Sequence, residues 1–186
     1  MNLYVIRHGE VNINVRNEIN SINDSILTEK GINQVEAAAD KLENYNIDLI
    51  ICSPISRTRE TCAHVNRKNI KVEYDDRLIE RDGKSMQFCS ADIIDWDIWY
   101  DASKNVIYKD TEGFGSVRKR IGEFLKEITK KYEDKNILLV THGDVCKAIY
   151  TLINNIKSVD ETLKFDQQNA EVVEYQINKY KRKWKK

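Results

Sequence analysis

Two histidine–glycine pairs and two arginines are the residues of this chain best suited to chemistry. They are Arg7, His8 and Gly9 in "RHGE", Arg57 in "SPISRTRET", and His142 and Gly143 in "THGD". A neutral imidazole is available as a nucleophile near neutral pH, and guanidinium groups match the geometry of phosphate oxygens. Together these residue types indicate a site for a compact dianion, of which phosphate is the obvious example.

Each of these groups follows a predicted buried strand. Residues 3–6, 47–52 ("IDLIIC") and 136–141 ("NILLVT") are apolar on both faces, as buried parallel strands are. The carboxyl ends of neighbouring parallel strands form the ligand crevice of an open α/β sheet. Two helices are predicted to begin there, one with Ser53 as N-cap before Pro54 and one after His142. Their N-termini add partial positive charge, so we expect the histidines and arginines to meet in one crevice.

The rest of the chain alternates strands with amphipathic helices. Thr28 is predicted to cap a helix whose apolar positions are Ile32, Val35, Ala39 and Leu42. Further helices are expected up to about residue 66, over 116–133 and after 142, and further strands at 70–74, 161–165 ("ETLKF") and 171–177 ("EVVEYQI"). This order predicts an α/β fold, a three-layer sandwich with a mostly parallel central sheet and helices on both faces.

The composition narrows the range of functions. The 186 residues fit one domain, and 30 cations balance 30 acidic groups, so no net charge favours nucleic acid or a membrane surface. No apolar run reaches the length of a membrane span, no signal peptide is recognisable, and the four cysteines form no Cys-x-x-Cys pair. We expect a cytoplasmic protein with free thiols, formed by a domain over 1–178 and a mobile basic tail over 179–186.

Four motifs occur in a familiar order. "RHGE", "LTEKG", "SPISRTRET" and "THGD" resemble the histidine phosphatase superfamily, which includes the cofactor-dependent phosphoglycerate mutases. The resemblance covers about residues 3–175. It implies phosphoryl transfer through a phosphohistidine, with no metal and no other cofactor.

The resemblance also implies a role for each matching residue. His8 would be the nucleophile, and Arg7, Arg57 and His142 would hold the three equatorial oxygens of the phosphoryl group. Gly9, Asn14 and Gly143 would contact phosphate or substrate, and Asn169 is a weaker match to a second asparagine. The Gly9 carbonyl is expected to accept the other ring N–H of His8, which would fix its tautomer.

A proton donor is expected after the third strand, in "RLIERDGKSMQ". The family places a glutamate in a Leu-x-Glu context there, which favours Glu80. The stretch departs from the family pattern in its glycine spacing, so Asp82 is the alternative. A surface ion pair of Glu80 with Arg77 or Arg81 is the purely structural interpretation.

Residues 84–110 are a possible lid or specificity segment, in which residues 86–108 combine large apolar side chains with acidic ones. The aromatic residues are Phe88, Trp96, Trp99, Tyr100 and Tyr108, and the acidic ones are Asp92, Asp95, Asp97 and Asp101. One interpretation is a lid helix with an aromatic wall that sets substrate choice; the other is an amphipathic helix whose aromatic residues belong to the core. His64 lies in no motif and is interpreted as structural.

The sequence supports a metal-independent phosphomonoesterase acting on a small phosphorylated metabolite. A phosphoglycerate mutase is less favoured, because the resemblance would then lead us to expect an adjacent Arg-Arg pair and a proline-rich stretch, whereas Pro54 is the only proline. A metal hydrolase would use His8-x-Glu10 and His142-x-Asp144 as ligand pairs, beside which Arg7 and Arg57 would be repulsive. A non-catalytic phosphate-binding module is the remaining alternative.

Overall fold

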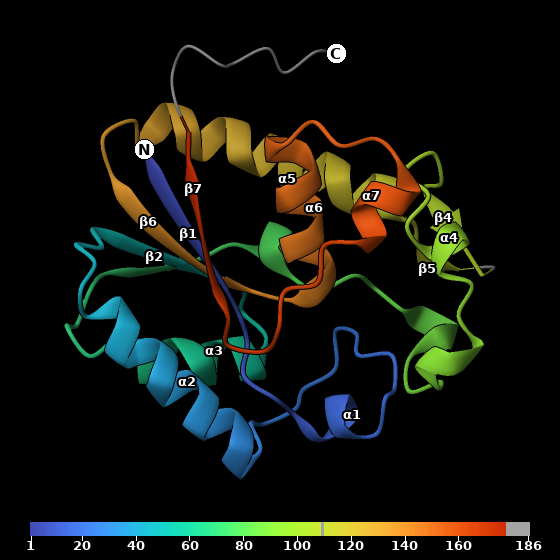
Figure 1. Ribbon diagram of the computed structural model, residues 1–186, viewed down its shortest axis with the longest axis horizontal. Coiled ribbons are helices and arrows are strands. Elements are labelled where there is room, and N and C mark those ends of the chain that lie inside the picture. Colours follow the sequence, from blue (N-terminus) through green and yellow to red (C-terminus); the bar gives the residue numbers. More distant parts are fainter. Residues whose placement is uncertain (109, 178–186) are drawn as a thin grey trace.

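A five-stranded sheet organises the computed structural model, which describes residues 1–108 and 110–177. Its strand order is β3-β2-β6-β1-β7 (Figure 1). The strands are β1 (Asn2–Arg7), β2 (Leu49–Cys52), β3 (Val72–Tyr74), β6 (Asn136–Thr141) and β7 (Val172–Gln176). The first four are parallel, and β7 runs antiparallel to β1 at the edge. The predicted α/β fold with a mostly parallel sheet is confirmed.

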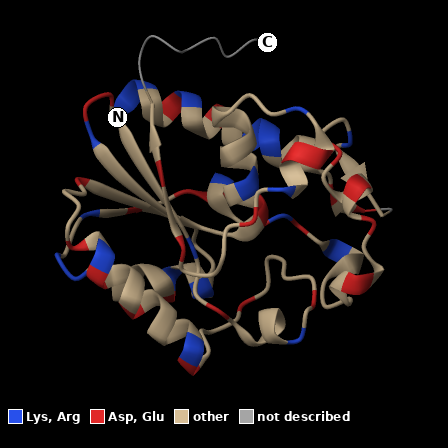
Figure 2. Ribbon diagram, viewed as in Figure 1, with Lys and Arg blue, Asp and Glu red and all other residues tan. Residues whose placement is uncertain are grey.

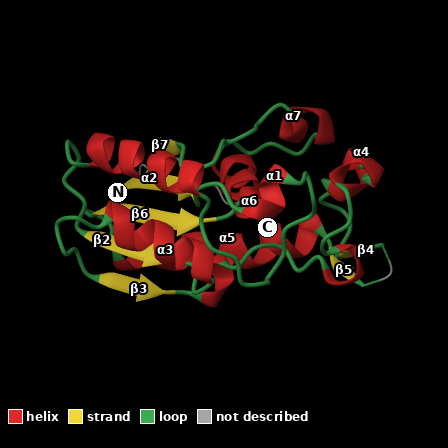
Figure 3. Cartoon of the chain, turned by 90° about the horizontal axis from the view of Figure 1, so that it is seen from below, coloured by secondary structure: helices red, strands yellow, loops and turns green. Residues whose placement is uncertain are grey.

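Helices cover both faces of this sheet (Figures 1 and 3). One face packs on α2 (Glu29–Leu42) and α3 (Ser56–Val65), and the other on α5 (Phe114–Lys131) and α6 (Gly143–Ile153). Alternate strand residues supply the two cores: Val5 and Leu139 face α5 and α6, whereas Ile6 and Val140 face α2 and α3. The continuous apolar runs of the sequence reflect this double burial.

The first turn of α2 is tied to the loop that follows β1. The Thr28 hydroxyl accepts a hydrogen bond from the Gly31 N–H at 2.9 Å, which is the predicted cap, and donates one to Glu10 Oε1 at 3.0 Å. A Cβ on Gly31 would lie 2.2 Å from the Glu10 carbonyl oxygen, so this approach requires glycine. The cap therefore holds α2 against a loop that begins two residues after His8.

Short elements surround the carboxyl end of the sheet. They are α1 (Asn12–Val15), α4 (Trp96–Trp99), α7 (Val159–Leu163), the hairpin strands β4 (Val106–Ile107) and β5 (Thr111–Glu112), and 3₁₀ turns at Asp76–Leu78, Lys84–Met86 and Ala91–Ile93. The helix predicted over 84–110 is wrong, because only one α-helical turn forms there. Lys84, Phe88 and Tyr108 have positive φ angles of 41°, 67° and 43°, which interrupt any continuous helix.

The strand predicted at residues 161–165 is also wrong. Residues 161–163 belong instead to α7, which begins after Ser158 and carries Asp160 and Glu161 in its first turn. Serine at the N-cap position and acidic residues in the first turn are helix-start signals. The apolar alternation of "ETLKF" was therefore too short to decide between helix and strand.

The start of α3 differs from the prediction as well. Ile55 is the N-cap, two residues after Ser53, and Pro54 precedes the helix. Ser53 cannot cap because its hydroxyl is hydrogen-bonded to His142 Nε2 at 2.8 Å. The Ser53 side chain, which was predicted to cap α3, instead hydrogen-bonds His142 at the end of the neighbouring strand β6.

The remaining sequence expectations concern the surface and the cysteines. Figure 2 shows cations and anions interspersed along α2 and α5, in keeping with the formal net charge of zero. No helix in residues 1–108 and 110–177 is long and apolar enough to cross a membrane. All four cysteines are free thiols. The predicted basic tail over 179–186 lies outside the described residues.

Replacing Thr28 with Ala should lower the free energy of unfolding by about 1 kcal/mol, because the Gly31 N–H loses its acceptor. Urea unfolding monitored by circular dichroism measures the change. Thr28→Ser keeps the hydroxyl and serves as the control, which should stay close to the wild type. Equal stability of the Ala and Ser variants would show that the cap contributes nothing.

Candidate active site

The register of β1 with β6 brings the two histidines together. Arg7 lies opposite Thr141, and the His8 N–H donates to the Thr141 carbonyl at 3.0 Å. The rings of His8 and His142, each one residue beyond its strand, have centroids 5.4 Å apart and meet edge to face. Both side chains are buried, with exposed fractions of 1% and 0%.

Hydrogen bonds orient both rings. His8 Nδ1 donates to the Gly9 carbonyl at 2.7 Å, as the sequence predicted. His142 Nε2 is hydrogen-bonded to Ser53 Oγ at 2.8 Å, across the adjacent strand end of β2. The sequence did not predict Ser53 as a partner of His142. Ser53 is a polar residue directly after the buried strand β2, which neighbours β6, and this position could have indicated the contact.

Both imidazoles are held in the neutral form. Burial, followed by the positive charges of Arg57 and Arg7, lowers the pKa of His8 well below its ordinary value. Burial and Arg57 lower the pKa of His142 in the same way. A neutral His8 that carries its proton on Nδ1 has a free lone pair on Nε2, the atom that a nucleophilic role requires.

The two arginines are partly committed to backbone carbonyls. Arg57, which is fully buried, donates to the carbonyls of Asn23 and Ser21 at 2.9 and 2.7 Å. Arg7 donates to the Gln167 carbonyl at 2.8 Å. Burial lowers the pKa of Arg57 to about 10, which leaves it cationic at neutral pH.

Three buried nitrogens at this strand end have no hydrogen-bond partner within the described residues: Arg7 Nε, Arg57 Nε and His142 Nδ1. Unpartnered buried polar atoms are uncommon in folded proteins and call for an explanation. Their convergence fits an anion that would accept hydrogen bonds from them.

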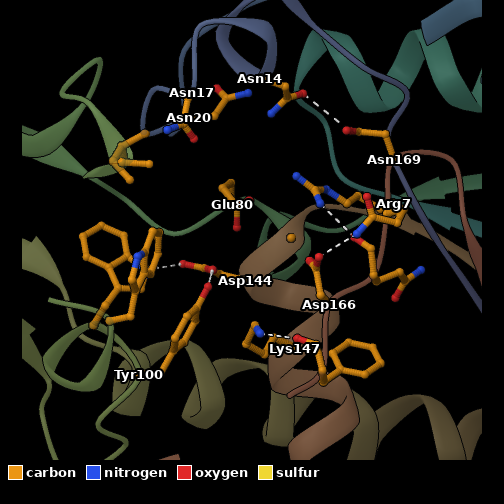
Figure 4. A pocket seen from close by; sticks show the side chains of 18 of the residues that line it. Arg7, Asn14, Asn17, Asn20, Glu80, Tyr100, Asp144, Lys147, Asp166 and Asn169 are labelled. Atoms are coloured by element: carbon orange, nitrogen blue, oxygen red, sulfur yellow. Dashed lines mark hydrogen bonds between the residues drawn. The ribbon is translucent and has the colours of Figure 1, made fainter. Parts of the chain in front are cut away.

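A pocket of about 360 Å³ opens at the carboxyl end of the sheet (Figure 4). Arg7, Asn14, Glu80, Gly143 and Asn169 line it, together with residues of the 11–27 loop and the 84–110 segment. His8, Arg57 and His142 are buried and are not among its lining residues. Arg7 and Gly143, the chain neighbours of His8 and His142, do line it, so the buried histidines lie directly behind this part of the lining.

Glu80 rather than Asp82 faces the pocket. It is 8% exposed, and its Oε1 accepts the Arg81 N–H at 2.9 Å. Burial, assisted by the negative charge of Asp144, raises the pKa of Glu80 to about 7. Asp82 instead pairs with Lys84 at 2.8 Å and does not line the pocket.

The alternative of a surface ion pair for Glu80 is wrong. Arg77 pairs with Asp75 at 2.6 Å and with Glu127 at 2.8 Å. Arg81 is buried and lies 3.4 Å from Asp144. A buried carboxyl with a raised pKa, free of any side-chain ion pair, has the properties of a general acid.

Asp144 connects the first turn of α6 to the aromatic segment. It accepts hydrogen bonds from Trp99 Nε1 at 3.1 Å and the Tyr100 hydroxyl at 2.8 Å. Arg81 stacks over the Trp99 ring at 4.5 Å and donates to the Trp99 carbonyl at 2.7 Å. Sequence analysis weighed Asp144 only as a metal ligand and therefore missed this network.

The two His-x-acid pairs do not assemble as metal ligands. The Glu10 carboxylate accepts hydrogen bonds from the Thr28 hydroxyl at 3.0 Å and from the Lys30 ammonium at 2.7 Å. The Asp144 carboxylate is held by Trp99, Tyr100 and Arg81. Across the part of the chain that the structure describes, no three His, Cys, Asp or Glu side chains gather in an arrangement that could hold a metal ion.

Residues 86–108 supply aromatic groups to the pocket but none of their four aspartates. Trp96, Trp99 and Tyr100 line the pocket, and Phe88 does not. The aspartates are used locally; Asp95, for example, caps α4 through the N–H groups of residues 97 and 98. The aromatic wall of the first interpretation is present, and Trp99 and Tyr100 also belong to a buried core cluster, as the second interpretation expects.

Gly9 and His64 have structural explanations. A Cβ on Gly9 would lie 2.7 Å from both the Gly31 carbonyl oxygen and Val35 Cγ2, so its glycine is required by packing against α2. Gly9 does not line the pocket. His64 of α3 is hydrogen-bonded to Glu36 of α2 at 2.6 Å, which agrees with the structural interpretation.

Comparison with known proteins identifies the family. Residues 3–186 match the histidine phosphatase superfamily (branch 1), and the chain belongs to it. Phosphoserine phosphatase 1 of Hydrogenobacter thermophilus is 28% identical over 155 residues, which are 80% of this chain and 74% of that protein. A 2,3-bisphosphoglycerate-dependent phosphoglycerate mutase of Mesorhizobium japonicum is 25% identical over 194 residues, covering 95% and 92%.

A solved structure has a fold similar to that of this chain. Bacillus stearothermophilus YhfR has a TM-score of 0.85 at 25% identity and covers 96% of this chain and 92% of its own. Phosphatases and mutases therefore both occur among the relatives. Family membership supports a phosphatase or phosphoryl-transfer enzyme.

Replacing Asp144 with Asn should lower the pKa of Glu80 from about 7 toward the ordinary range of a glutamate, because a neighbouring negative charge is removed. The single amide oxygen can still accept from either Trp99 Nε1 or the Tyr100 hydroxyl, which bind different oxygens of the carboxylate. An NMR titration of the Glu80 carboxyl measures the pKa. Asp82→Asn removes an equal charge outside the pocket and should leave that pKa unchanged; equal shifts in both variants would contradict the assignment.

Proposed function

We propose that this protein is a metal-independent phosphomonoesterase that acts on a small phosphorylated metabolite through a phosphohistidine. The observation that carries the proposal is a neutral, buried His8 beside two guanidinium groups, with a carboxyl of pKa about 7 lining the adjoining pocket. A nucleophile, a set of oxygen ligands and a proton donor are the three components that phosphoryl transfer needs.

In the first step, the lone pair of His8 Nε2 forms a bond to phosphorus while the ester P–O bond breaks. The departing oxygen takes the proton of Glu80, which becomes a carboxylate. Arg7, Arg57 and His142 hold the three equatorial oxygens, where transition-state charge accumulates. The free Nε of each arginine and the free Nδ1 of His142 support this role, since a phosphoryl group would accept their hydrogen bonds.

In the second step, water attacks the phosphohistidine. Glu80, now a carboxylate, takes a proton from the water, and the N–P bond breaks to release inorganic phosphate and neutral His8. A carboxyl with a pKa near 7 is suited to both directions, because it gains and loses its proton at similar cost. The Gly9 carbonyl keeps the His8 proton on Nδ1 throughout.

Gly143 and Asn14 are proposed as contacts of the bound phosphate or substrate. Gly143 begins α6, and a Cβ there would lie 3.6 Å from the Arg7 guanidinium carbon. Asn14 lines the pocket and shares its amide oxygen with the Val11 N–H and with Asn169. Gly9 is proposed to act through its carbonyl on His8 rather than through contact with substrate.

Two alternatives are less well supported. A mutase must hold a phosphorylated acid, and Lys147 is the one cation besides Arg7 among the described residues that line the pocket. A non-catalytic binding module would not need a buried proton donor with a raised pKa. We therefore place water as the acceptor of the phosphoryl group.

His8→Ala should abolish turnover of p-nitrophenyl phosphate while leaving the circular dichroism spectrum unchanged, because the nucleophile is removed without disturbing the sheet. Rapid acid-free quenching of the wild type with ³²P-labelled substrate should trap acid-labile, base-stable phosphate on the protein. The assays are run with and without a chelator, and turnover should persist in both. Substantial activity in His8→Ala, or loss on chelation that zinc restores, would refute the mechanism.

Glu80→Gln should slow an alkyl phosphate by about a hundred- to ten-thousand-fold, because an alkoxide leaves poorly without a proton. The loss for p-nitrophenyl phosphate should be much smaller. Wild-type kcat/KM for the alkyl ester should fall as the pH rises through about 7, where Glu80 loses its proton, and the variant should lack that alkaline limb. Equal losses for both esters would indicate a structural role, and a larger loss in Asp82→Asn would move the assignment.

Phosphate release from monoesters should far exceed interconversion of 3- and 2-phosphoglycerate. The assay supplies 2,3-bisphosphoglycerate as primer and follows both products. Because the pocket offers few cations for a second anionic group, interconversion should remain at background. Interconversion faster than phosphate release would place the chain among the mutases.

A further inference from the structure

Two acidic groups around the outer part of the pocket are already paired with cations within the protein. We define the outer pocket as the lining residues beyond the phosphate end, namely Asn17, Glu18, Asn20, Trp96, Trp99, Tyr100, Asp144, Lys147 and Asp166. Glu18 pairs with Arg16 at 2.9 Å, and Asp144 lies 3.4 Å from Arg81. Neither carboxylate is therefore an unopposed charge.

Lys147 is similarly committed. Its ammonium donates to the carbonyls of Thr162 (3.1 Å) and Phe165, and it lies 4.7 Å from the centroid of the Tyr100 ring. The side chain is 8% exposed. A carboxylate or second phosphate in the outer pocket would lose hydration and find no uncommitted cation among the described lining residues.

Asp166 also disfavours a second anionic group in the outer pocket. It is exposed, and its carboxylate is bonded to the neutral amide of Gln168 at 2.6 Å. Its negative charge would repel a second anionic group on the substrate. Both this repulsion and the attraction of a cationic group are weak, because an exposed charge is screened by water and salt.

An aromatic face remains available in the same region. Trp96 stacks on Tyr100 with a centroid distance of 5.9 Å and an interplanar angle of 16°, and Trp99 meets Trp96 nearly edge on. Trp96 is still 38% exposed. A large half-exposed aromatic side chain offers a flat surface on which another ring can pack.

Asparagine side chains line the side of the pocket opposite the aromatic residues. Figure 4 shows Asn14, Asn17 and Asn20 across the pocket from Tyr100, with Glu80 between them. Both polar atoms of the Asn20 carboxamide are buried and have no hydrogen-bond partner within the described residues. An amide with an open donor and an open acceptor is complementary to hydroxyl groups, which both donate and accept.

We propose that the outer pocket selects monophosphates whose leaving group is a neutral, hydroxylated ring, packed on Trp96 and hydrogen-bonded by Asn20. The proposal rests on the proposed phosphatase function and names its substrate class. A leaving group with a carboxylate or second phosphate would be rejected by the lack of a free cation. An acyclic leaving group would leave the aromatic face uncovered.

The test compares primary alkyl phosphates, so that the chemical step is matched. The neutral ring esters are glucose 6-phosphate and ribose 5-phosphate; the references are 3-phosphoglycerate (anionic), phosphoethanolamine (cationic) and glycerol 3-phosphate (neutral, acyclic). The better ring ester should exceed each reference in kcat/KM by about tenfold or more, as one stacking contact and one hydrogen bond predict. A reference ester equal to or better than both ring esters would overturn the proposal. No turnover of any ester, p-nitrophenyl phosphate included, would instead refute the phosphatase function itself.

Two variants separate the aromatic contribution from general damage. Trp96→Ala should lower kcat/KM for the preferred ring ester by about three- to tenfold and leave glycerol 3-phosphate nearly unchanged. Phe88→Ala is the matched control, since Phe88 is an exposed aromatic residue of the same segment that does not line the pocket. Equal losses on ring and acyclic esters in Trp96→Ala would contradict the stacking role.

A charge reversal tests the exclusion of anions. Asp166→Lys adds an uncommitted cation to the pocket rim and should raise kcat/KM for 3-phosphoglycerate relative to the ring ester by about threefold, since an exposed charge acts only weakly. Asp160→Lys makes the same change on the exposed surface of α7, outside the pocket, and should leave the ratio unchanged. An unchanged ratio in Asp166→Lys, or equal changes in both variants, would show that the outer pocket does not discriminate by charge.

Discussion

The parallel pairing of β1 with β6 sets Arg7 opposite Thr141, and the arrangement of the proposed phosphate site depends on that register. Side chains alternate between the two faces of a sheet, so a slip of one residue would move His8 away from His142 and exchange the two cores. The register is specified strongly because both faces are buried: Val5 and Leu139 pack on one side, Ile6 and Val140 on the other. Chemistry at the strand ends is thus positioned by packing several residues earlier in each strand.

Gathering cations at a buried strand end has an electrostatic consequence. Burial, assisted by the positive charges of Arg57 and Arg7, lowers the pKa values of His8 and His142 and keeps both rings neutral, and neutrality is what makes an imidazole nucleophilic. The two guanidinium groups donate hydrogen bonds to the backbone carbonyls of Ser21, Asn23 and Gln167, which stabilise their charges. A buried charge needs such partners, and a phosphoryl dianion would provide stronger ones. The same electrostatics that favour the anion therefore also prepare its nucleophile.

The sequence predicted a structural feature correctly where the residues that determine it lie close together in the chain. Buried strands are recognisable as continuous apolar runs, and Thr28 capped α2 as predicted, since a cap involves residues only three apart. Prediction failed where a distant contact decided the outcome. Ser53 does not cap α3 because His142 engages its hydroxyl, and Gly9 is needed because α2 packs against it. The network around Asp144 joins residues from three separate segments, which local patterns do not reveal.

That network suggests how recognition and protonation are linked. Asp144 holds Trp99 and Tyr100 through their N–H and O–H groups, and its charge raises the pKa of Glu80. Arg81, the residue after Glu80, reaches the same carboxylate and the Trp99 carbonyl. The wall that would contact the leaving group and the acid that would protonate it are therefore fixed by one carboxylate. Loss of that carboxylate would therefore free Trp99 and Tyr100 from their shared partner and lower the pKa of Glu80 at the same time.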